Sequence, residues 1–555
     1  MKLLFCFAIC MLTLGAVYAQ GAANNWYFGD NAGLNFTTSP PTAIQNGRLN
    51  TLEGCATISN EQGNLLFYTD GSTVYNKDHQ IMENGQGLYG NASSTQSAII
   101  IPQPENDSVY YIFTIDSPND VGAYNGLNYS IVDFSTNPLG EVTLKNRHLL
   151  NYSSEKLSAV IQGCDSESVW MVTFSSFNPI YTPENFQVLN TFYAYEITPN
   201  GVNTVPVKSQ LNMFITDLRG NLKFSPDGSK IAAANLSSPL YLMDFNSLTG
   251  VVSNPKTINI FEGDKFAYGV EFSPDNRYLY VDSSNDLPPE VPASSNSSTL
   301  SQFDLESANI AVSQVVLHQA NYYRGSLQLG PDGKIYRALS RHYQEGIPYL
   351  GVIENPNEAG TASTYIDQAI NLGSGLSYQG LPPFNQSLFN TIDIIKNNES
   401  TSQLNLCEGE TYTLKYDIIT GATYSWYLND VKISGETSQK LNIKQDPGRS
   451  LPYTDKYELY LNLNDGSTCE KIGLADVTYN PYPKAPDSIP TLTQCEDSDT
   501  ADGYSIFNLD EILPDLTGGN KTLQVTYFET EADAQNQTNS VEPFGYANKQ
   551  PQDTL

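Results

Sequence analysis

Short runs of β-branched and aromatic residues, separated by turn residues, repeat along most of this chain. Runs of Val, Ile, Tyr and Phe end at Asn-Gly, Asp-Gly and Pro-Asp pairs, whereas the spacing of an amphipathic helix is hard to find. Such runs are typical of strands joined by tight turns, because Gly and Asn accept the backbone conformations that hairpins need. The pattern predicts an almost all-β protein.

One turn motif recurs at intervals of about 50 residues, a length typical of propeller blades. It reads FSPDG at 224–228, FSPDN at 272–276 and LGPDG at 329–333, and a strand-forming run follows each copy. Asp is expected to cap the turn and Gly to take positive φ, so these residues are interpreted as structural.

Aligning the chain on these turns yields seven candidate blades, each with a comparable first strand. The last has too little chain of its own, so we expect strands at 25–29 and 33–36 to complete it and leave no open sheet edge. We predict a seven-bladed, WD-repeat-like β-propeller over residues 20–395. The first strands lie in LEGCATIS (52–59), TQSAIIIPQP (95–104), EKLSAVIQG (155–163), LRGNLKFSP (218–226), YGVEFSP (268–274), RGSLQLGPDG (324–333) and YQGLPPF (378–384).

The first strand of every blade lines the central channel, so the residues that precede these strands meet at one mouth. Together they form a mixed polar ring, which is the candidate ligand-binding site. Its members are Glu53, Gln96, Lys156, Arg219, Tyr268, Arg324 and Gln379.

The pattern changes near residue 395, where the polar stretch 394–403 is interpreted as a linker. Residues 404–480 contain Cys407, Trp426 and Cys469, an arrangement similar to the disulfide and buried indole of immunoglobulin-like sandwiches. We favour a Cys407–Cys469 disulfide over free thiols, because an exported protein meets an oxidising compartment. A second β-module is expected over 485–555, cut short at its last strand.

The first 19 residues are typical of a secretory signal peptide. Lys2 precedes an apolar run, and Val17-Tyr18-Ala19 forms a small-residue cleavage site. No later run approaches the roughly 18 apolar residues that a membrane span needs, so no transmembrane segment is predicted. The mature chain keeps an odd number of cysteines, and whether the first two pair is left open: Cys55, Cys164, Cys407, Cys469 and Cys495.

Charge and composition narrow the function classes. With 28 basic against 60 acidic residues the formal charge is −32, which makes nucleic acid an unlikely partner. The chain has four His, none in a nucleophile motif, and lacks HExxH and CxxC patterns, so no catalytic residue and no transition metal is predicted. Glu53 and Glu155 are the acids placed near the mouth, and a propeller glycosidase would need such a pair.

The segment 497–503 alternates acids and ends in Gly, a spacing that can wrap a hard cation with oxygens. Asp497, Asp499 and Asp502 are the candidate calcium ligands. The segment lacks the Glu that closes an EF-hand loop, so a solvated acidic turn is favoured over a calcium site, and no other cofactor is expected.

Several stretches resemble large secreted proteins of the Bacteroidetes, of the gliding-motility-associated type that carries a C-terminal type IX secretion sorting domain. The modules after residue 404 resemble the polycystic-kidney-disease-type repeats of those proteins and a further repeat around Cys495. No sorting domain is present, which suggests the N-terminal part of a longer protein. The matching stretches are WYFGDNAGLNF (26–36), TLEGCATIS (51–59), GNLLFYTDG (63–71), VYNKDHQIMENG (74–85), SSTQSAIIIPQP (93–104), LCEGETYTL (406–414) and VTYFETEADA (525–534).

The sequence therefore favours a non-enzymatic protein, secreted or on the outer cell surface, that binds an extracellular glycan or a surface protein. A polysaccharide hydrolase or lyase and a purely structural surface-layer component are the alternatives. Paired acids at an open groove would favour the hydrolase. A channel filled by side chains would favour the structural role, and an open polar ring without paired acids would favour binding.

Overall fold

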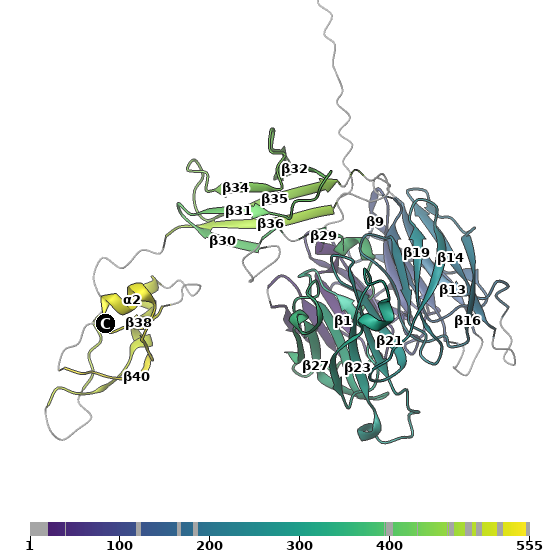
Figure 1. Ribbon diagram of the computed structural model, residues 1–555, viewed down its shortest axis with the longest axis horizontal. Helices are drawn as coiled ribbons and strands as arrows, with labels where there is room; N and C mark the ends of the chain where they lie inside the picture. The colour runs from purple at the N-terminus through teal and green to yellow at the C-terminus, as the bar shows by residue number, and fades with distance from the viewer. Residues whose placement is uncertain are drawn as a thin grey trace, which may run out of the picture. The chain divides into compact units, whose positions relative to one another are not determined.

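The computed structural model describes residues 20–38, 40–117, 124–163, 168–180, 187–392, 394–395, 403–429, 431–462, 464, 471–482, 491–495, 502–518 and 525–550. Strands dominate these residues (Figure 1), as the hydrophobic pattern predicted. A search of the same residues finds no helix long and apolar enough to cross a membrane. The expected signal peptide lies outside them.

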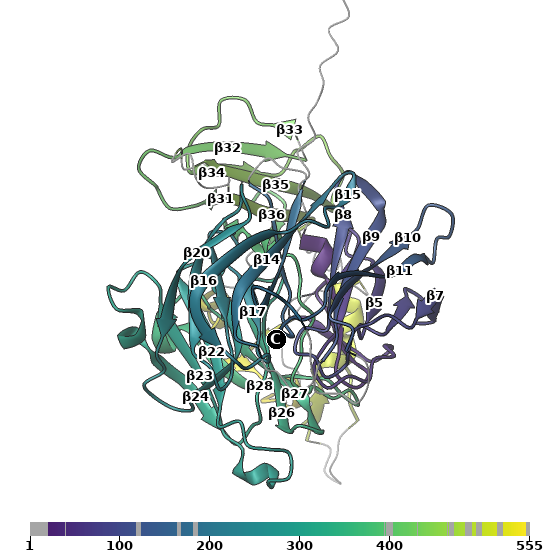
Figure 2. The ribbon, with the colours of Figure 1, turned by 90° about the vertical axis from the view of Figure 1, so that its right-hand side faces the viewer.

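Contacts divide the chain into two compact units. The first contains residues 1–404, 413–441 and 455–476, and the second contains 405–412, 442–454 and 477–555. The propeller lies within the first unit. Its sheets follow one another around the ring in Figure 2, from β5 and β7 through β9, β14 and β20 to β22 and β26.

The first three blades are antiparallel sheets numbered in chain order. A single parallel bridge between Glu83 and Glu141 joins the outer edges of blades 1 and 2. Blade 1 holds β4 (Ala56–Ser59), β5 (Leu65–Thr69), β6 (Thr73–Asn76) and β7 (Ile81–Gln86), blade 2 holds β8 (Ala98–Gln103), β9 (Asn106–Ile115), β10 (Leu127–Asp133) and β11 (Glu141–Leu150), and blade 3 holds β12 (Ser158–Ile161), β13 (Val169–Ser175), β14 (Leu189–Thr198), β15 (Gly201–Val202) and β16 (Val207–Ile215).

Blades 4 to 6 are four-stranded sheets with the same strand order, and short 3₁₀ turns occur in their loops. Blade 4 holds β17 (Leu222–Phe224), β18 (Lys230–Ala233), β19 (Leu240–Asn246) and β20 (Val251–Ile258), blade 5 holds β21 (Phe266–Phe272), β22 (Tyr278–Ser284), β23 (Ser298–Asp304) and β24 (Val315–Ala320), and blade 6 holds β25 (Leu327–Leu329), β26 (Ile335–His342), β27 (Glu345–Ile353) and β28 (Tyr365–Asn371).

The N-terminal strands complete blade 7, as expected from the sequence. β1 (Asn25–Phe28), β2 (Ala32–Asn35) and β3 (Thr42–Ile44) form its sheet, and Asp30 bridges to Leu376 from the other end of the propeller sequence. The backbone of Gln379 lies between blades 6 and 1, because its N–H donates to Leu52 at 3.0 Å and its carbonyl accepts from Ser326 at 2.7 Å. The ring is therefore closed by both ends of the propeller sequence.

The stretch 378–384 differs from the other six first strands, because it forms no strand. This corrects the expectation that all seven blades begin alike. Pro382 and Pro383 lack the backbone N–H that a sheet ladder requires, so the chain leaves the blade here.

Residues 381–389 then cross the channel to the opposite wall. Asn385 makes a parallel bridge to Ala159 of β12, and Ser387 Oγ accepts from the Ile161 N–H at 3.0 Å. The segment ends in a 3₁₀ turn, η5 (Gln386–Phe389), whose first turn is capped by the Asn385 side chain. Nearly every residue of this crossing segment is buried, so the backbone itself fills part of the channel.

Apolar side chains form separate cores between neighbouring blades. One cluster joins blades 1 and 2, another blades 2 and 3, another blades 3 and 4, and another blades 4 and 5. The largest cluster spans blades 5, 6, 7 and 1 and includes Trp26, Leu381, Phe384 and Phe389. The crossing segment is thus part of the core that closes the ring.

The repeated turns have the structural role that the sequence predicted. In the first copy Asp227 accepts from the N–H of Ser229 at 3.0 Å, and Gly228 has φ of +70°. In the second copy Asn276 takes the left-handed position with φ of +68°, and in the third Gly333 does so with φ of +75°. Each of these turns connects the first strand of its blade to the second.

Two further modules follow the propeller. In the first, Trp426 is fully buried and donates its indole N–H to the Ser438 carbonyl at 2.8 Å. Cys469 lies outside the described residues and Cys407 is a free thiol, so the structure does not show the expected Cys407–Cys469 disulfide. The strands are β29 (Thr391–Ile392), β30 (Gln403–Cys407), β32 (Thr423–Leu428), β33 (Val431–Lys432), β35 (Tyr453–Asn462) and β36 (Lys471–Asn480) in one sheet, and β31 (Thr411–Lys415) and β34 (Lys440–Lys444) in another.

The last module combines two short hairpin-like pairs with short helices, so it is less purely β than expected. The Tyr527 hydroxyl donates to the Leu509 carbonyl at 3.0 Å and links its two parts. Its elements are β37 (Ile506–Asn508) paired with β40 (Phe544–Ala547), β38 (Tyr527–Phe528) paired with β39 (Ser540–Val541), and the helices α1 (Leu513–Thr517) and α2 (Glu531–Asn536).

Phe384→Ala is expected to lower the free energy of unfolding by about 4 kcal/mol, because it removes a buried ring from the core that closes the propeller. Phe384 is 2% exposed and lies beside the rings of Trp26 and Phe389. Urea unfolding of the purified chain measures the change. Phe261→Ala is the matched control, because that ring is 58% exposed and its loss should change the free energy by less than about 0.5 kcal/mol. Equal effects would contradict the role of the crossing segment.

Candidate binding site at the channel mouth

The seven predicted ring residues do meet at one end of the channel. They lie at or just before the first strand of their blades, or, for Gln379, where the closing segment enters between blades 6 and 1. Six of them are buried, and the side chain of Arg219 is 31% exposed. The structure does not test their role in binding, but it shows that a ligand could reach Arg219 far more easily than the other six.

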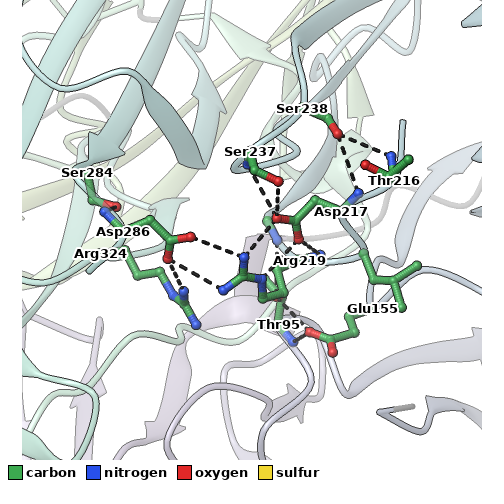
Figure 3. A network of polar contacts seen from close by, with 12 residues as sticks. Thr95, Glu155, Thr216, Asp217, Arg219, Ser237, Ser238, Ser284, Asp286 and Arg324 are labelled. Atoms are coloured by element: carbon green, nitrogen blue, oxygen red, sulfur yellow. Dashed lines mark hydrogen bonds and ion pairs between the residues drawn. The ribbon is translucent and has the colours of Figure 1, made fainter. Parts of the chain in front are cut away.

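A chain of alternating carboxylates and guanidinium groups crosses the mouth (Figure 3). Glu53 Oε1 accepts from Arg324 Nη2 at 3.1 Å. Arg324 Nη1 donates to Asp286 Oδ1 at 2.8 Å, as Figure 3 shows. Asp286 Oδ2 in turn accepts from Arg219 Nη2 at 3.1 Å. Arg219 also forms a two-pronged pair with Asp217, with distances of 2.9 and 2.8 Å. The charges of the mouth are therefore paired within the protein.

Asp217 and Arg219 stabilise each other's charged forms. Burial alone would raise the pKa of Asp217, but the hydrogen bonds and charge of Arg219 outweigh it and lower that pKa to about 2. The hydroxyl of Ser237 adds a hydrogen bond to Asp217 Oδ2 at 2.8 Å. Asp217 consequently stays ionised at any physiological pH and holds Arg219 in place.

Arg324 is a buried cation of the mouth that contacts two aromatic rings. Its guanidinium carbon lies 5.0 Å from the ring centre of Tyr268 and 4.9 Å from that of Tyr323, so two aromatic faces contact it. Each charged residue of the Glu53–Arg324 pair has one polar atom without a hydrogen-bond partner in the described part of the chain, Glu53 Oε2 and Arg324 Nε. Buried polar atoms normally have partners, so this spot can accommodate a water molecule or a polar ligand group.

Glu155 and Lys156 lie beneath the exposed rim. Glu155 accepts from the Thr95 N–H at 3.2 Å and from the Ser117 hydroxyl at 2.9 Å, and burial followed by the charge of Glu53 raises its pKa to about 7. Lys156 donates to the backbone carbonyls of Leu218 and Arg219, and burial lowers its pKa to about 7. Both groups serve to join neighbouring blades.

The two glutamines of the ring also connect blades. Gln96 exchanges two hydrogen bonds with the backbone of Leu222, at 2.8 and 3.3 Å, and Gln379 Nε2 donates to the Tyr343 carbonyl at 3.0 Å. These contacts fix the loops that surround the mouth.

Deeper in the channel, inner strands of blades 4, 5 and 6 meet through buried polar side chains. Lys223 Nζ lies 3.0 Å from Glu271 Oε2 and also contacts Gln328 Oε1. Burial lowers the pKa of Lys223 and raises that of Glu271, so the pair is tightly coupled. Together with the crossing segment, this cluster fills the channel below the mouth.

Sequence reasoning missed three contributors to the mouth. Asp217 and Thr95 lie within two residues of predicted ring members and could have been included for that reason. Asp286 belongs to the loop between β22 and β23, far along the chain from both of its arginine partners, and no local pattern marks it. It is nevertheless the residue that joins the two arginines.

The predicted calcium ligands and the first two cysteines of the mature chain lie only partly within the described residues. Asp497 and Asp499 lie outside the described residues, and the Asp502 side chain accepts from the Tyr504 N–H at 3.1 Å, so the calcium hypothesis is not tested. Cys164 also lies outside the described residues, whereas Cys55 is a buried free thiol whose pKa is raised, mainly by burial.

A shallow cavity of about 260 Å³ lies beside the mouth at blades 2 and 3. The imidazole of His148 lies 2.8 Å from Asn151 Oδ1 at its edge. The cavity is lined by Tyr124, Asn125, His148, Asn151 and Ile180.

Comparison with protein families matches residues 491–555 to the Flavobacterium inter-domain disulphide bond domain. The match covers the last module and includes Cys495. It agrees with an origin of this module among Bacteroidetes proteins, and it does not bear on gliding motility, type IX secretion or the polycystic-kidney-disease-type repeat. No curated protein matches the chain.

Solved structures with low identity resemble the chain. A candidate 6-phosphogluconolactonase from Bacteroides uniformis is 11% identical with a TM-score of 0.37, over 63% of this chain and 98% of that one. The extracellular domain of a candidate hybrid two-component system from Bacteroides thetaiotaomicron is 10% identical with a TM-score of 0.30, over 79% of this chain and 57% of that one. The Dos1 propeller is 9% identical with a TM-score of 0.29, over 50% of this chain and 73% of that one. Because these TM-scores are low, the propeller fold is assigned from the strand pairing of this chain and not from the similarity.

Glu155→Gln is expected to stabilise the protein at pH 8 and to have little effect at pH 4. A carboxyl whose pKa is raised from 4.5 to about 7 in the folded state contributes stability below pH 4.5 that is lost as the pH rises to 7. Gln removes that loss, so the difference in unfolding free energy should grow to about 3 kcal/mol above pH 7. Urea unfolding at several pH values measures it.

Glu262→Gln is the control, because Glu262 is exposed and its substitution should show no such pH dependence. A constant difference between Glu155→Gln and the parent chain from pH 4 to pH 8 would contradict the raised pKa.

Proposed function

We propose that this chain is a non-enzymatic binding protein of the cell surface or the extracellular space, which contacts its ligand with the rim of the channel mouth. The observation that carries the proposal is the partly exposed side chain of Arg219 in a polar ring whose other six members are buried. The modules after residue 404 act as spacers in this proposal. A glycan or a surface protein is the ligand class.

The filled channel supports binding at the rim and argues against binding inside the propeller. The crossing segment and the Lys223–Glu271 pair occupy the space below the ring. A filled channel also favours the structural alternative that the sequence raised. The rim favours the binding role over the structural role. A purely structural propeller does not need an accessible guanidinium group such as that of Arg219, which is held by Asp217 and Asp286.

A polysaccharide hydrolase is the alternative that the mouth supports less well. A glycosidase needs two carboxyl groups that reach the glycosidic bond. Glu53 is held by Arg324 and Glu155 by Thr95 and Ser117, and both acids are buried. They are better placed to hold blades together than to contact a polymer.

The matched family suggests a role for Cys495. Its name describes an inter-domain disulfide, and Cys495 is an exposed thiol in this structure. We propose that Cys495 pairs with a cysteine of another domain.

Arg219→Ala is expected to abolish ligand binding by the rim while the fold is retained. A glycan array and a surface-protein capture experiment, both with the chain from residue 20 onward, measure binding. Arg277→Ala is the control, because Arg277 is an exposed arginine in the turn between β21 and β22, at the end of blade 5 opposite the mouth, and its loss should not change binding. Cleavage of any bound polysaccharide would refute the non-enzymatic proposal, and equal binding by the parent chain and Arg219→Ala would refute the rim as the site.

The Cys495 proposal is tested separately by peptide mapping of the secreted protein without reduction. A disulfide-linked peptide that contains Cys495 and a cysteine from outside residues 491–555 is expected. Alkylation of Cys495 in the unreduced protein would show that it is a free thiol.

A further inference from the structure

We infer that Arg219 and Arg324 form a carboxylate-binding site for an acidic polysaccharide, and that Asp286 occupies this site in the unliganded protein. This inference rests on the proposed function and names its ligand class. A uronic acid residue of the polysaccharide would supply a carboxylate in the place of the Asp286 side chain.

Asp286 lies between the two arginines as a bound carboxylate would. Its Oδ1 accepts from Arg324 at 2.8 Å and its Oδ2 accepts from Arg219 at 3.1 Å. Arginine recognises carboxylates through such paired hydrogen bonds. Two arginines from blades 4 and 6 therefore converge on one carboxylate position at the surface of the mouth, as Figure 3 shows.

The backbone of Asp286 is poorly suited to a permanent contact. Its φ is +42°, a left-handed value that is uncommon for residues other than glycine. The residue is the second of the loop that joins β22 to β23, and residues 288–290 of that loop are exposed. A loop residue held in this conformation can leave the arginines at a lower cost than a residue of an inner strand.

Exchange of one carboxylate for another preserves the charge balance of the mouth. Arg219 keeps its pair with Asp217, and Arg324 keeps its pair with Glu53. If Asp286 moved away with no replacement, the buried guanidinium of Arg324 would lose one of its two anionic partners, which is costly. A ligand carboxylate restores that partner, so the site selects for an acidic group despite the negative charge of the whole chain.

An unpartnered donor adds a second observation. Arg324 is 4% exposed, and its Nε has no hydrogen-bond partner among the described residues. A ligand with more acceptor atoms than the Asp286 side chain, such as a carboxylate with a neighbouring ring oxygen or hydroxyl, could satisfy this donor directly or through water.

The surroundings favour a sugar over an acidic peptide. The half-buried ring of Tyr343 lies 6.4 Å from that of Tyr323, which contacts Arg324, and its hydroxyl lies 2.6 Å from Ser93 Oγ. Ser237 and Ser238 add hydroxyl groups on the other side of Arg219. Aromatic faces and hydroxyl groups around a cation are suited to a sugar ring that carries a carboxylate.

The test is calorimetric titration of the folded chain, from residue 20 onward, with trigalacturonate and with its methyl ester, which lacks the negative charges. Asp286→Asn removes the competing carboxylate, and Asn tolerates positive φ. This variant is expected to bind trigalacturonate about tenfold more tightly than the parent chain, because a charge-assisted contact becomes available. The methyl ester should show no gain, and adding Arg219→Ala should remove the gain for trigalacturonate.

Asp304→Asn is the matched control. Asp304 pairs with the exposed Arg277 at 3.0 Å, and Arg277 lies in the turn between β21 and β22, at the other end of its strands. An equal gain in this control would show a general effect of charge and overturn the inference. A stronger gain for tri-glutamate than for trigalacturonate would overturn the sugar class. No gain for Asp286→Asn, with its fold verified by circular dichroism, would overturn the site.

A second measurement applies if Asp286→Asn does not fold. The parent chain should then bind trigalacturonate more tightly than Arg219→Ala at low ionic strength, and equal affinities would overturn the inference. Failure of the carboxylate site can be told apart from failure of the proposed function. If neutral glycans bind the parent chain but not Arg219→Ala, the rim is a binding site but the carboxylate site is refuted.

Discussion

Closure of the ring between blades 6 and 1 is the constraint on which the rest of this propeller depends. Each blade is a small sheet with apolar faces, and it is buried only when a neighbour packs on both sides. The N-terminal strands and the residues after β28 supply the missing neighbour together. The largest core cluster lies at this junction and includes Trp26 and Phe384. Without it, two blade faces would be exposed to water.

Closure also decides the nature of the channel. After Gln379 the chain does not form a regular inner strand but crosses to β12, where Asn385 bridges to Ala159. This crossing backbone and the buried Lys223–Glu271 pair lie below the mouth. Buried polar residues at the first strands join neighbouring blades in this protein.

Burial explains why the charges of the mouth form one connected chain. A guanidinium or carboxylate group removed from water is costly unless an opposite charge and hydrogen bonds accompany it. Arg324 meets this requirement with Glu53, Asp286 and two tyrosine rings. Asp286 differs from the other members of this chain of charges in its left-handed backbone, with φ of +42°, and for that reason we propose it as the exchangeable member.

Much of the architecture could be predicted from local patterns. Six of the seven first strands begin where the repeat alignment placed them, and the N-terminal strands complete blade 7 as expected. The repeat works because each blade has the same local requirement, a short apolar strand that follows a polar residue and precedes a tight turn. The stretch 378–384 did not follow this rule, since Pro382 and Pro383 cannot join a ladder.

The sequence by itself determined the all-β class, the blade period, and the residues that gather at the mouth, because these depend on spacing and turn chemistry within each repeat. Only the tertiary structure decided that the ring residues are buried, that the channel is filled, and that Asp286 joins Arg219 to Arg324. Those features arise from contacts between residues far apart in the chain, such as Glu53 with Arg324. Packing of whole blades sets such distances, and no local pattern of residues carries them.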